Sequence, residues 1–292
     1  MSSPARERLD EAVTRLGLAP TRSKARAMIM AGDVLVNGLP SLQAGTAVKA
    51  NDEISLKARP RFVSRGGEKL DHALNAFGVD VTGFACADLG ASTGGFTDCL
   101  LQRGASRVYA VDVGYGQIDQ RLRDDPRVVV EERVNARYLE SLPEPVNLVV
   151  IDVSFISLSL ILPVAVRLLI ENGICVPLVK PQFEAGRKDV GKGGVVRDRA
   201  IHRRVLDEVA GYAAANGFTL CGVTTSPITG PAGNVEFLMD LRKGVDSLNE
   251  PASMIEKGFA ERRTAGPFLM ISKPRSSCRR MRRMTACASI RI

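Results

Sequence analysis

From residue 84 to residue 241, short apolar segments alternate with segments of helical periodicity, and this alternation restricts the fold more than any other feature. Runs this short and this apolar are typical of strands buried on both faces of a parallel sheet. The order of the segments therefore predicts an α/β fold with a doubly wound, mostly parallel, Rossmann-like sheet of seven strands. The predicted strands span residues 84–89, 108–113, 128–131, 146–152, 174–180, 219–225 and 235–241, and the predicted helices span 95–103, 156–170 and 198–216. A loop rich in Gly and Pro at 228–234 predicts that the last two strands form an antiparallel hairpin.

The rest of the chain divides around this sheet. Residues 1–60 hold helical patterns at 6–16 and 23–30, followed by strand-like pieces with Gly-Asp and Asn-Gly turns, which predicts a small α+β domain. Residues 61–64 are interpreted as a linker and residues 65–244 as the sheet domain, which opens on a helix at 68–77. Residues 245–292 are predicted to be a basic, disordered tail, because residues 273–292 contain six arginines and no acidic residue.

The net charge of +8 and the pI of about 9.4 indicate a polyanionic partner such as RNA. Residues 250–292 hold ten Lys and Arg against three Glu, so the rest of the chain is almost neutral and RNA contacts must come from local patches. Aromatic residues are few, which favours recognition of shape and phosphates over base stacking. The candidate RNA-binding residues are Arg6, Arg22, Lys24, Arg26, Arg65, Arg187, Lys188 and Lys192.

The last three of these residues lie in a glycine-hinged loop that we expect to be a mobile lid over RNA phosphates. The segment from Gly186 to Gly193 resembles a nucleotide-binding P-loop. It lacks the Ser or Thr that would hold Mg²⁺, and it does not follow a strand directly, so nucleotide hydrolysis is not expected.

Several classes of protein are disfavoured by composition. Six cysteines without a Cys-x-x-Cys pair, and two distant histidines, argue against a zinc site, so we expect no metal. The apolar stretch at 158–170 is shorter than a membrane span and contains Pro163 and Arg167, and residues 1–15 are not a secretory signal. We therefore expect a cytoplasmic protein without a membrane partner; the oligomeric state stays open.

A glycine-rich turn, from Asp88 to Gly95, lies between a predicted strand and a predicted helix. Its glycines let the backbone approach a ligand closely, and Asp112 ends the next strand, where an acidic side chain commonly binds a ribose diol. The pattern is not the dinucleotide G-x-G-x-x-G, and it suits S-adenosylmethionine, which has no pyrophosphate. The expected cofactor-binding residues are Asp88, Gly90, Ser92, Thr93, Gly94, Gly95, Phe96 and Asp112.

Charged residues mark the ends of three predicted strands. Asp152 and Lys180 end theirs and Glu236 begins the last, so an antiparallel last strand would bring all three to one edge, where Lys69 could join them. A ribose hydroxyl must lose its proton as it attacks a methyl group, and Lys180 could accept that proton or stabilise the alkoxide. We therefore expect Lys69, Asp152, Lys180 and Glu236 to be catalytic.

The motifs also carry a family resemblance. Residues 21–26 and 32–38 resemble the small RNA-binding domain of ribosomal small-subunit protein S-four. Residues 63–70, 88–98, 152–157 and 179–184 resemble the RrmJ/FtsJ-like 2′-O-methyltransferases, and the chain to about Gly244 is similar to the TlyA family, also called hemolysin A. The resemblance implies methylation of the cytidine 2′-oxygen in ribosomal RNA or ribosomal subunits, with a Lys-Asp-Lys-Glu tetrad at the four residues named above.

Two alternatives come from other classes. A membrane-active haemolysin would need an exposed amphipathic or spanning segment, and the sequence offers none. An RNA-binding module without catalysis would not require the four charged residues, all of which are present. A DNA or protein amino-methyltransferase is disfavoured because no Asn/Asp-Pro-Pro-Tyr/Phe motif follows the fourth main strand.

Overall fold

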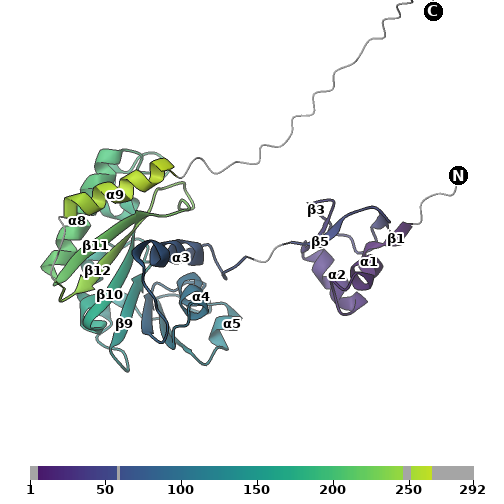
Figure 1. Cartoon of the computed structure of the whole chain (residues 1–292), viewed down its shortest axis with the longest axis horizontal. Helices are drawn as coiled ribbons and strands as arrows, with labels where there is room; N and C mark the ends of the chain where they lie inside the picture. The colour runs from purple at the N-terminus through teal and green to yellow at the C-terminus, as the bar shows by residue number, and fades with distance from the viewer. Residues whose placement is uncertain (1–5, 58–59, 246–250, 265–292) are drawn as a thin grey trace, which may run out of the picture. The chain divides into compact units, whose positions relative to one another are not determined.

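The computed structural model describes residues 6–57, 60–245 and 251–264, and it divides the chain into two compact units, Met1–Ser64 and Arg65–Ile292 (Figure 1). Each unit has its own hydrophobic core. The expected disorder of residues 273–292 lies outside the described residues.

The N-terminal unit packs two helices, α1 (Leu9–Arg15) and α2 (Arg22–Met30), against short strands. Strand β2 (Val34–Val36) pairs with β3 (Leu39–Pro40) and β5 (Ile54–Leu56). The prediction of one helix over residues 6–16 is wrong at its start, because β1 (Arg6–Arg8) pairs with β4 (Ala47–Lys49) and the helix begins at Leu9.

Local signals explain the boundaries of this unit. The Thr21 hydroxyl accepts a hydrogen bond from the Lys24 amide and caps α2. Asn37 and Gly38 both have positive φ, at 50° and 77°, and they form the two-residue turn between β2 and β3. The predicted Asn-Gly turn is therefore confirmed.

The C-terminal unit is built on a seven-stranded sheet in the order β11-β12-β10-β9-β6-β7-β8. Pairing is parallel from β10 through β8, whereas β12 runs antiparallel to both of its neighbours, so the predicted sheet and terminal hairpin are confirmed. The strands are β6 (Ala85–Leu89), β7 (Arg107–Asp112), β8 (Val128–Glu132), β9 (Val146–Ile151), β10 (Leu169–Val179), β11 (Phe218–Thr225) and β12 (Phe237–Lys243).

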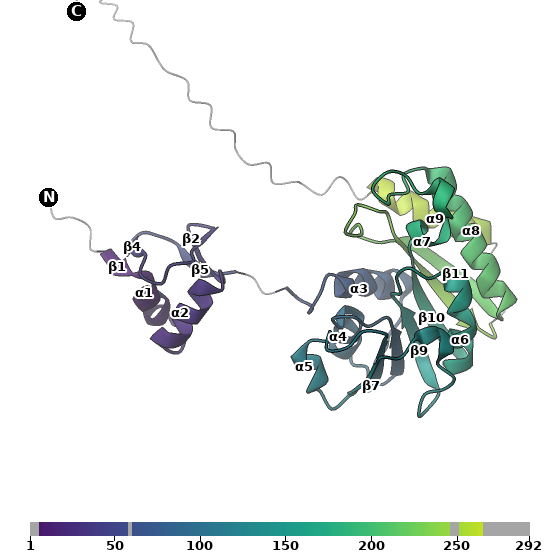
Figure 2. The same ribbon diagram turned by 180° about the vertical axis from the view of Figure 1, so that it is seen from behind.

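Helices cover both faces of this sheet (Figures 1 and 2). On one face α3 (Gly66–Phe77) packs on α4 (Gly95–Gln102), and the short α5 (Gln120–Arg123) follows β7. On the other lie α6 (Leu162–Leu168) and α8 (Arg199–Ala215). Asp198 caps α8 as expected, accepting a hydrogen bond from the Ala200 amide. The helix predicted over 156–170 is shorter, because a 3₁₀ turn at Leu158–Leu160 precedes α6 and β10 begins at Leu169.

The prediction that order ends near Gly244 is wrong for one segment. Residues Pro251–Thr264 form α9, which packs against β11 and α8. Three of its side chains, Met254, Ile255 and Phe259, belong to the main hydrophobic core. Burial of these side chains is the physical reason that the folded unit extends beyond Gly244.

Candidate active site

The site lies where the strand order reverses. β6 and β9 are neighbours in the sheet although β7 and β8 come between them in the chain, and ligands of open α/β sheets bind at such a switch point. The Asp152 amide, just after β9, donates a hydrogen bond to the Leu89 carbonyl at the end of β6. A Cβ on Gly90 would lie 2.8 Å from the Asp152 carbonyl oxygen, and Gly90 has a φ of 91°. Only glycine fits this contact between the two strand ends.

A cavity of about 790 Å³ opens beside this turn. Of the expected cofactor residues, Gly90, Ser92 and Asp112 line it, together with the catalytic candidate Asp152. The remaining expected residues, Asp88, Thr93, Gly94, Gly95 and Phe96, do not line the cavity. Phe96 is buried within α4, and a Cβ on Gly94 would clash with Leu122. These two residues therefore contribute to the packing of the turn.

Sequence reasoning missed part of the cavity wall. Asn135 follows β8, Gln117 lies in the loop after β7, and Ser154 and Ile156 follow β9. Each comes after the carboxyl end of a parallel strand, which is the signal that could have found them.

Two carboxylates organise the glycine-rich turn. Asp112 accepts hydrogen bonds from the Ser92 amide at 2.8 Å and the Gly114 amide at 2.6 Å. Asp88 is fully buried, and its Oδ2 accepts from the amide and hydroxyl of Thr97 at 2.9 and 2.7 Å. Its Oδ1 is buried without a hydrogen-bond partner in the structure.

The environment of Asp88 disfavours its charged form. Burial raises its pKa to about 7, the hydrogen bonds from Thr97 act in the opposite direction, and the nearby charges of Asp152 and Asp112 raise the pKa further. The carboxyl group therefore titrates near neutral pH directly beneath the glycine-rich turn.

The four catalytic candidates form two contacting pairs. Lys180 Nζ lies 2.7 Å from Asp152 Oδ1, and Lys69 Nζ lies 2.5 Å from Glu236 Oε2. Lys180 Nζ also donates to the Val153 carbonyl at 2.8 Å and the Ser154 hydroxyl at 2.9 Å, so its three hydrogen-bond donors are all engaged. Lys69, Lys180 and Glu236 are buried, whereas Asp152 is partly exposed and lines the cavity.

The two pairs are neighbours across the sheet. Val179 of β10 pairs with Phe237 of β12, so Lys180, the next residue after Val179, lies opposite Glu236 in this antiparallel register. Lys69 reaches Glu236 from α3. The structure thus brings Lys69, Asp152, Lys180 and Glu236 to one edge of the sheet beside the glycine-rich turn.

An aromatic pair next to these charges was not anticipated from the sequence. Phe155 is 90% exposed and adopts a φ of 64°, a left-handed conformation that is uncommon for a bulky residue. Its ring stacks at a tilt on Phe183, with centroids 4.9 Å apart, and Lys180 Nζ lies 5.9 Å from the Phe183 centroid.

Glu184 holds this aromatic pair together. Its carboxylate accepts hydrogen bonds from the Leu158 amide at 2.9 Å and the Ser157 hydroxyl at 2.7 Å, which ties the loop after β9 to α7 (Pro181–Glu184). Burial raises the pKa of Glu184, and these two hydrogen bonds oppose the rise. The loop bearing Phe155 and the helix bearing Phe183 are therefore fixed to one another.

In the N-terminal unit, three arginines converge on one carboxylate. Arg8, Arg22 and Arg26 each direct Nε to the buried Asp10, at 3.0, 2.9 and 2.8 Å. Burial raises the pKa of Asp10, but the hydrogen bonds from the arginines outweigh it and hold the pKa well below its ordinary value. Two of the candidate RNA-binding residues, Arg22 and Arg26, belong to this cluster, whereas Arg6 and Lys24 are exposed outside it.

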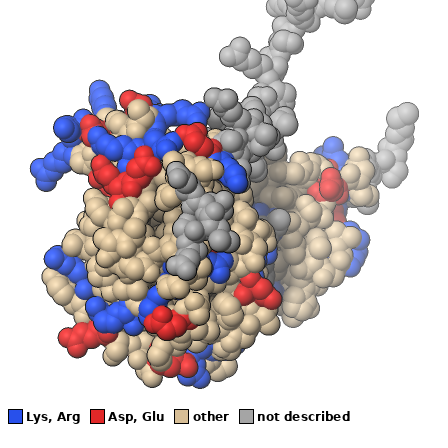
Figure 3. Space-filling view, turned by 60° about the vertical axis from the view of Figure 1, so that its left-hand side comes forward, with Lys and Arg blue, Asp and Glu red and all other residues tan. Residues whose placement is uncertain are grey.

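The basic loop after α7, which we expect to act as a lid, is held near both of its ends. Asn234 donates to the Gly194 carbonyl and accepts from the Val196 amide, and Arg204 pairs with Asp189. The candidates Arg187, Lys188 and Lys192 are exposed on this loop, and Arg65 is exposed at the start of α3. In the view of Figure 3, Lys and Arg gather mainly at the upper left and lower left, where Asp and Glu are mixed among them, and much of the remaining described surface is uncharged.

Comparison with known proteins identifies the fold and its relatives. Residues 62–243 match the model of the FtsJ-like methyltransferases. The chain belongs to the FtsJ-like methyltransferase family. Residues 7–54 match the S4 domain, so this methyltransferase carries an S4 domain ahead of its sheet.

Relatives of this FtsJ-like methyltransferase cover most of the chain. A Mycobacterium tuberculosis protein named 16S/23S rRNA (cytidine-2′-O)-methyltransferase TlyA is 48% identical over 245 residues, covering 82% of this chain and 91% of the relative. Hemolysin A of Brachyspira hyodysenteriae is 44% identical over 237 residues, 79% of this chain and 98% of the relative. A solved Streptococcus thermophilus structure that carries the hemolysin name has a TM-score of 0.66 at 42% identity, covering 90% of this chain and 98% of that one. The expected resemblance to the TlyA family is confirmed.

The described residues hold neither a membrane-spanning helix nor a cluster of metal ligands. Among the helices that the structure describes, none is both long enough and apolar enough to cross a bilayer. Within residues 6–57, 60–245 and 251–264, no group of three or more His, Cys, Asp or Glu side chains is placed to hold a metal ion.

Proposed function

We propose that this protein uses S-adenosylmethionine to methylate the ribose 2′-oxygen of a cytidine in ribosomal RNA. The observation that carries the proposal is the meeting of Lys69, Asp152, Lys180 and Glu236 beside the glycine-rich turn. The relative from Mycobacterium tuberculosis, named for this reaction, supports the choice of nucleoside and RNA. Ribosomal RNA is a cytoplasmic substrate, so we place the enzyme in the cytoplasm.

The residues around the cavity fit S-adenosylmethionine. Asp112 still has lone pairs for a ribose diol after accepting its two backbone hydrogen bonds, and the backbone at Gly90 leaves no Cβ in the way of a close approach. The cavity of about 790 Å³ is within the range of sites for small cofactors. When bound, the cofactor supplies an electrophilic methyl group on a sulfonium, and this chemistry requires no metal.

The charged residues then act on the ribose hydroxyl. Three residues that line the cavity, Asp152, Val153 and Ser154, supply the oxygen atoms that hold Lys180 Nζ. We assign to Lys180 the electrostatic stabilisation of the negative charge that develops on the 2′-oxygen as the hydroxyl proton leaves to water. Because the three donors of Lys180 are engaged, a hydrogen bond to the substrate oxygen would replace one of them. The Lys69–Glu236 ion pair lies next to Lys180 across the sheet. Because Lys69 pairs with Glu236 and Lys180 pairs with Asp152, the two positive charges are each matched by a carboxylate.

RNA is held by parts of the chain with different chemistry. The S4 domain supplies the half-exposed guanidinium groups around Asp10, which suit phosphate oxygens. The exposed Phe155, backed by Phe183, offers a stacking surface for a base that has been splayed out of its helix. The exposed cations Arg187, Lys188 and Lys192 would contact the backbone nearby.

The decisive experiment is methyl transfer from labelled S-adenosylmethionine to isolated ribosomal subunits, followed by mapping of the modified nucleotide. We expect label in one or a few cytidine riboses and none in bases or protein. Transfer to a base, or no transfer to either subunit or to free ribosomal RNA, would overturn the proposal. Leakage of lipid vesicles in place of methyl transfer would favour the haemolysin alternative.

A further inference from the structure

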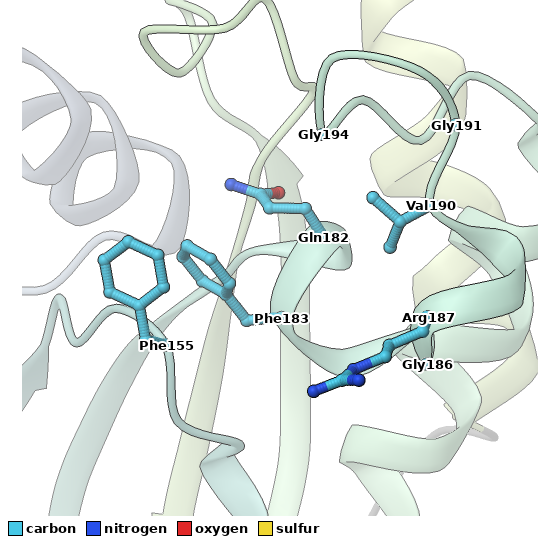
Figure 4. Close-up of a pocket in the computed structure, with 8 residues that line it drawn as sticks. All are labelled: Phe155, Gln182, Phe183, Gly186, Arg187, Val190, Gly191 and Gly194. Carbon is cyan, nitrogen blue, oxygen red and sulfur yellow. The ribbon is translucent and has the colours of Figure 1, made fainter.

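A second cavity adjoins the first. Its volume is about 600 Å³, and Phe155 lines both cavities, so the two meet at this exposed ring. The wall of the second cavity also includes Gln182, Phe183 and Arg187 (Figure 4). Because Phe183 lies beside Lys180, a ribose that reaches Lys180 would carry its base into this second cavity.

Gln182 presents an unused amide to this cavity. Its Oε1 is buried without a hydrogen-bond partner, and no described residue bonds to its Nε2. An unmet buried acceptor costs about 1–3 kcal/mol, so such atoms are rare unless a ligand or water completes them. Figure 4 shows this amide next to the Phe155–Phe183 pair, with Arg187 separate from it.

The position of the amide is fixed relative to the catalytic lysine. Only Pro181 separates Gln182 from Lys180, and both precede the Glu184 carboxylate that ties α7 to the loop after β9. The aromatic pair can stack any base, because every base has a π face. Discrimination between bases must therefore come from a polar group, and the cation of Arg187 suits a phosphate better than a pyrimidine edge.

We propose that Gln182 is the residue that selects cytosine in the target nucleotide, by accepting a hydrogen bond from the exocyclic amino group. Cytosine presents that amino donor beside the N3 acceptor, so a carboxamide in one orientation accepts from the amino group through Oε1 and donates to N3 through Nε2. Uracil presents the opposite pattern, an O4 acceptor and an N3–H donor, so it could pair with Gln182 only after the amide turned over and Oε1 left the buried position that it holds in the structure. This inference rests on the proposed function and adds the group that reads the base.

The test compares two substrates with the full-length enzyme. Ribosomal subunits are reconstituted with C or with U at the mapped nucleotide, and the ratio of kcat/KM for C over U is measured. We expect the wild-type ratio to be on the order of tenfold to a hundredfold, and Gln182→Leu to bring it near one by slowing transfer to C. Gln182→Glu retains the acceptor and should keep the preference for C at a lower rate.

A matched control at Phe183 separates base recognition by Gln182 from base stacking. Phe183→Leu should slow transfer to both substrates and leave the ratio intact, since stacking does not distinguish C from U. If transfer by Gln182→Leu is too slow to follow, the same ratio is taken from the dissociation constants of the two subunits. An unchanged ratio in Gln182→Leu overturns the role of Gln182, whereas a wild-type enzyme that methylates no ribose overturns the proposed function as well.

Discussion

Lys69 Nζ lies 2.5 Å from Glu236 Oε2, although 167 positions separate these residues in the chain. Both side chains are buried, so replacing either one leaves an uncompensated charge away from water. Lys69→Met or Glu236→Gln alone should lower the free energy of unfolding by about 3–5 kcal/mol. The double variant should lose clearly less than the sum of the two, as urea unfolding of all four proteins would measure. Additive losses would mean that the two charges do not depend on one another.

Lys180 is expected to act on the reaction and not on cofactor binding. Lys180→Ala should lower kcat/KM for methyl transfer about 10²- to 10³-fold, because it removes the cation that Asp152 holds and that stabilises charge on the 2′-oxygen. Affinity for S-adenosylmethionine, measured by calorimetry, should change little, since Lys180 does not line the cofactor cavity. Lys257→Ala, at an exposed lysine of α9, is the control and should retain activity. Full activity in Lys180→Ala would remove this residue from the mechanism.

Asp88 should make the stability of the cofactor-free protein depend on pH. Its pKa is about 7 in the folded state, against about 3.9 for an unfolded aspartate, so the folded state binds more protons between these values. Stability contributed by the protonated carboxyl is therefore lost as pH rises through this window. Asp88→Asn escapes the loss, and its stability relative to wild type should increase by about 2 kcal/mol between about pH 5 and about pH 7. If thermal unfolding showed the same change of stability with pH in wild type and in Asp88→Asn, the raised pKa of Asp88 would be contradicted.

For Asp10→Asn, net charge and arginine geometry predict changes of opposite sign in RNA affinity. Asp10→Asn makes the S4 domain more positive but releases three arginines, so we expect RNA affinity to fall on the order of fivefold, or about 1 kcal/mol. Glu11→Gln removes the same charge one residue away, where Arg22 is its one ion-pair partner among the described residues, and it should leave affinity equal or higher. Binding to ribosomal RNA across a salt series would measure both variants.

The salt dependence of RNA binding and the direction of the affinity change in Asp10→Asn distinguish a lost phosphate contact from an effect of net charge. The slope of affinity against salt should become shallower by about one in Asp10→Asn if a phosphate contact is lost. Tighter binding by this variant would show that the arginines act through bulk charge alone. Melting curves of both variants establish that the N-terminal unit still folds.

The meeting of the four proposed catalytic residues was predictable because alternating strands and helices fix where strand ends meet. Asp152, Lys180 and Glu236 each adjoin an apolar run, and the antiparallel hairpin then brings Glu236 to the ends of the parallel strands. Phe155 was not predictable, since its exposure depends on a left-handed turn that the sequence does not signal. The start of α1 was misplaced for a similar reason: β1 forms only because a partner strand at Ala47–Lys49 is available.

The largest departure from the sequence-based prediction is α9, and Gly258 explains it. Glycine disfavours a helix, so this segment carries a weak helical signal. In the structure a Cβ at Gly258 would lie 2.7 Å from the Val223 carbonyl oxygen, so glycine is what lets the helix approach β11. The Thr225 hydroxyl donates to the Gly258 carbonyl and fastens the same contact.

This packing makes α9 part of the folded unit, so removing a buried side chain of α9 should lower the free energy of unfolding. Ile255 is fully buried in the core, so Ile255→Ala should lower the free energy of unfolding by about 2–5 kcal/mol through lost contacts and a cavity. Lys257→Ala, two residues away and exposed, should stay within about 0.5 kcal/mol of wild type. Equal stabilities in urea would mean that α9 does not pack on β11 in solution. A loss confined to Ile255→Ala would show that the methyltransferase unit ends beyond Gly244, at a helix held by its core side chains.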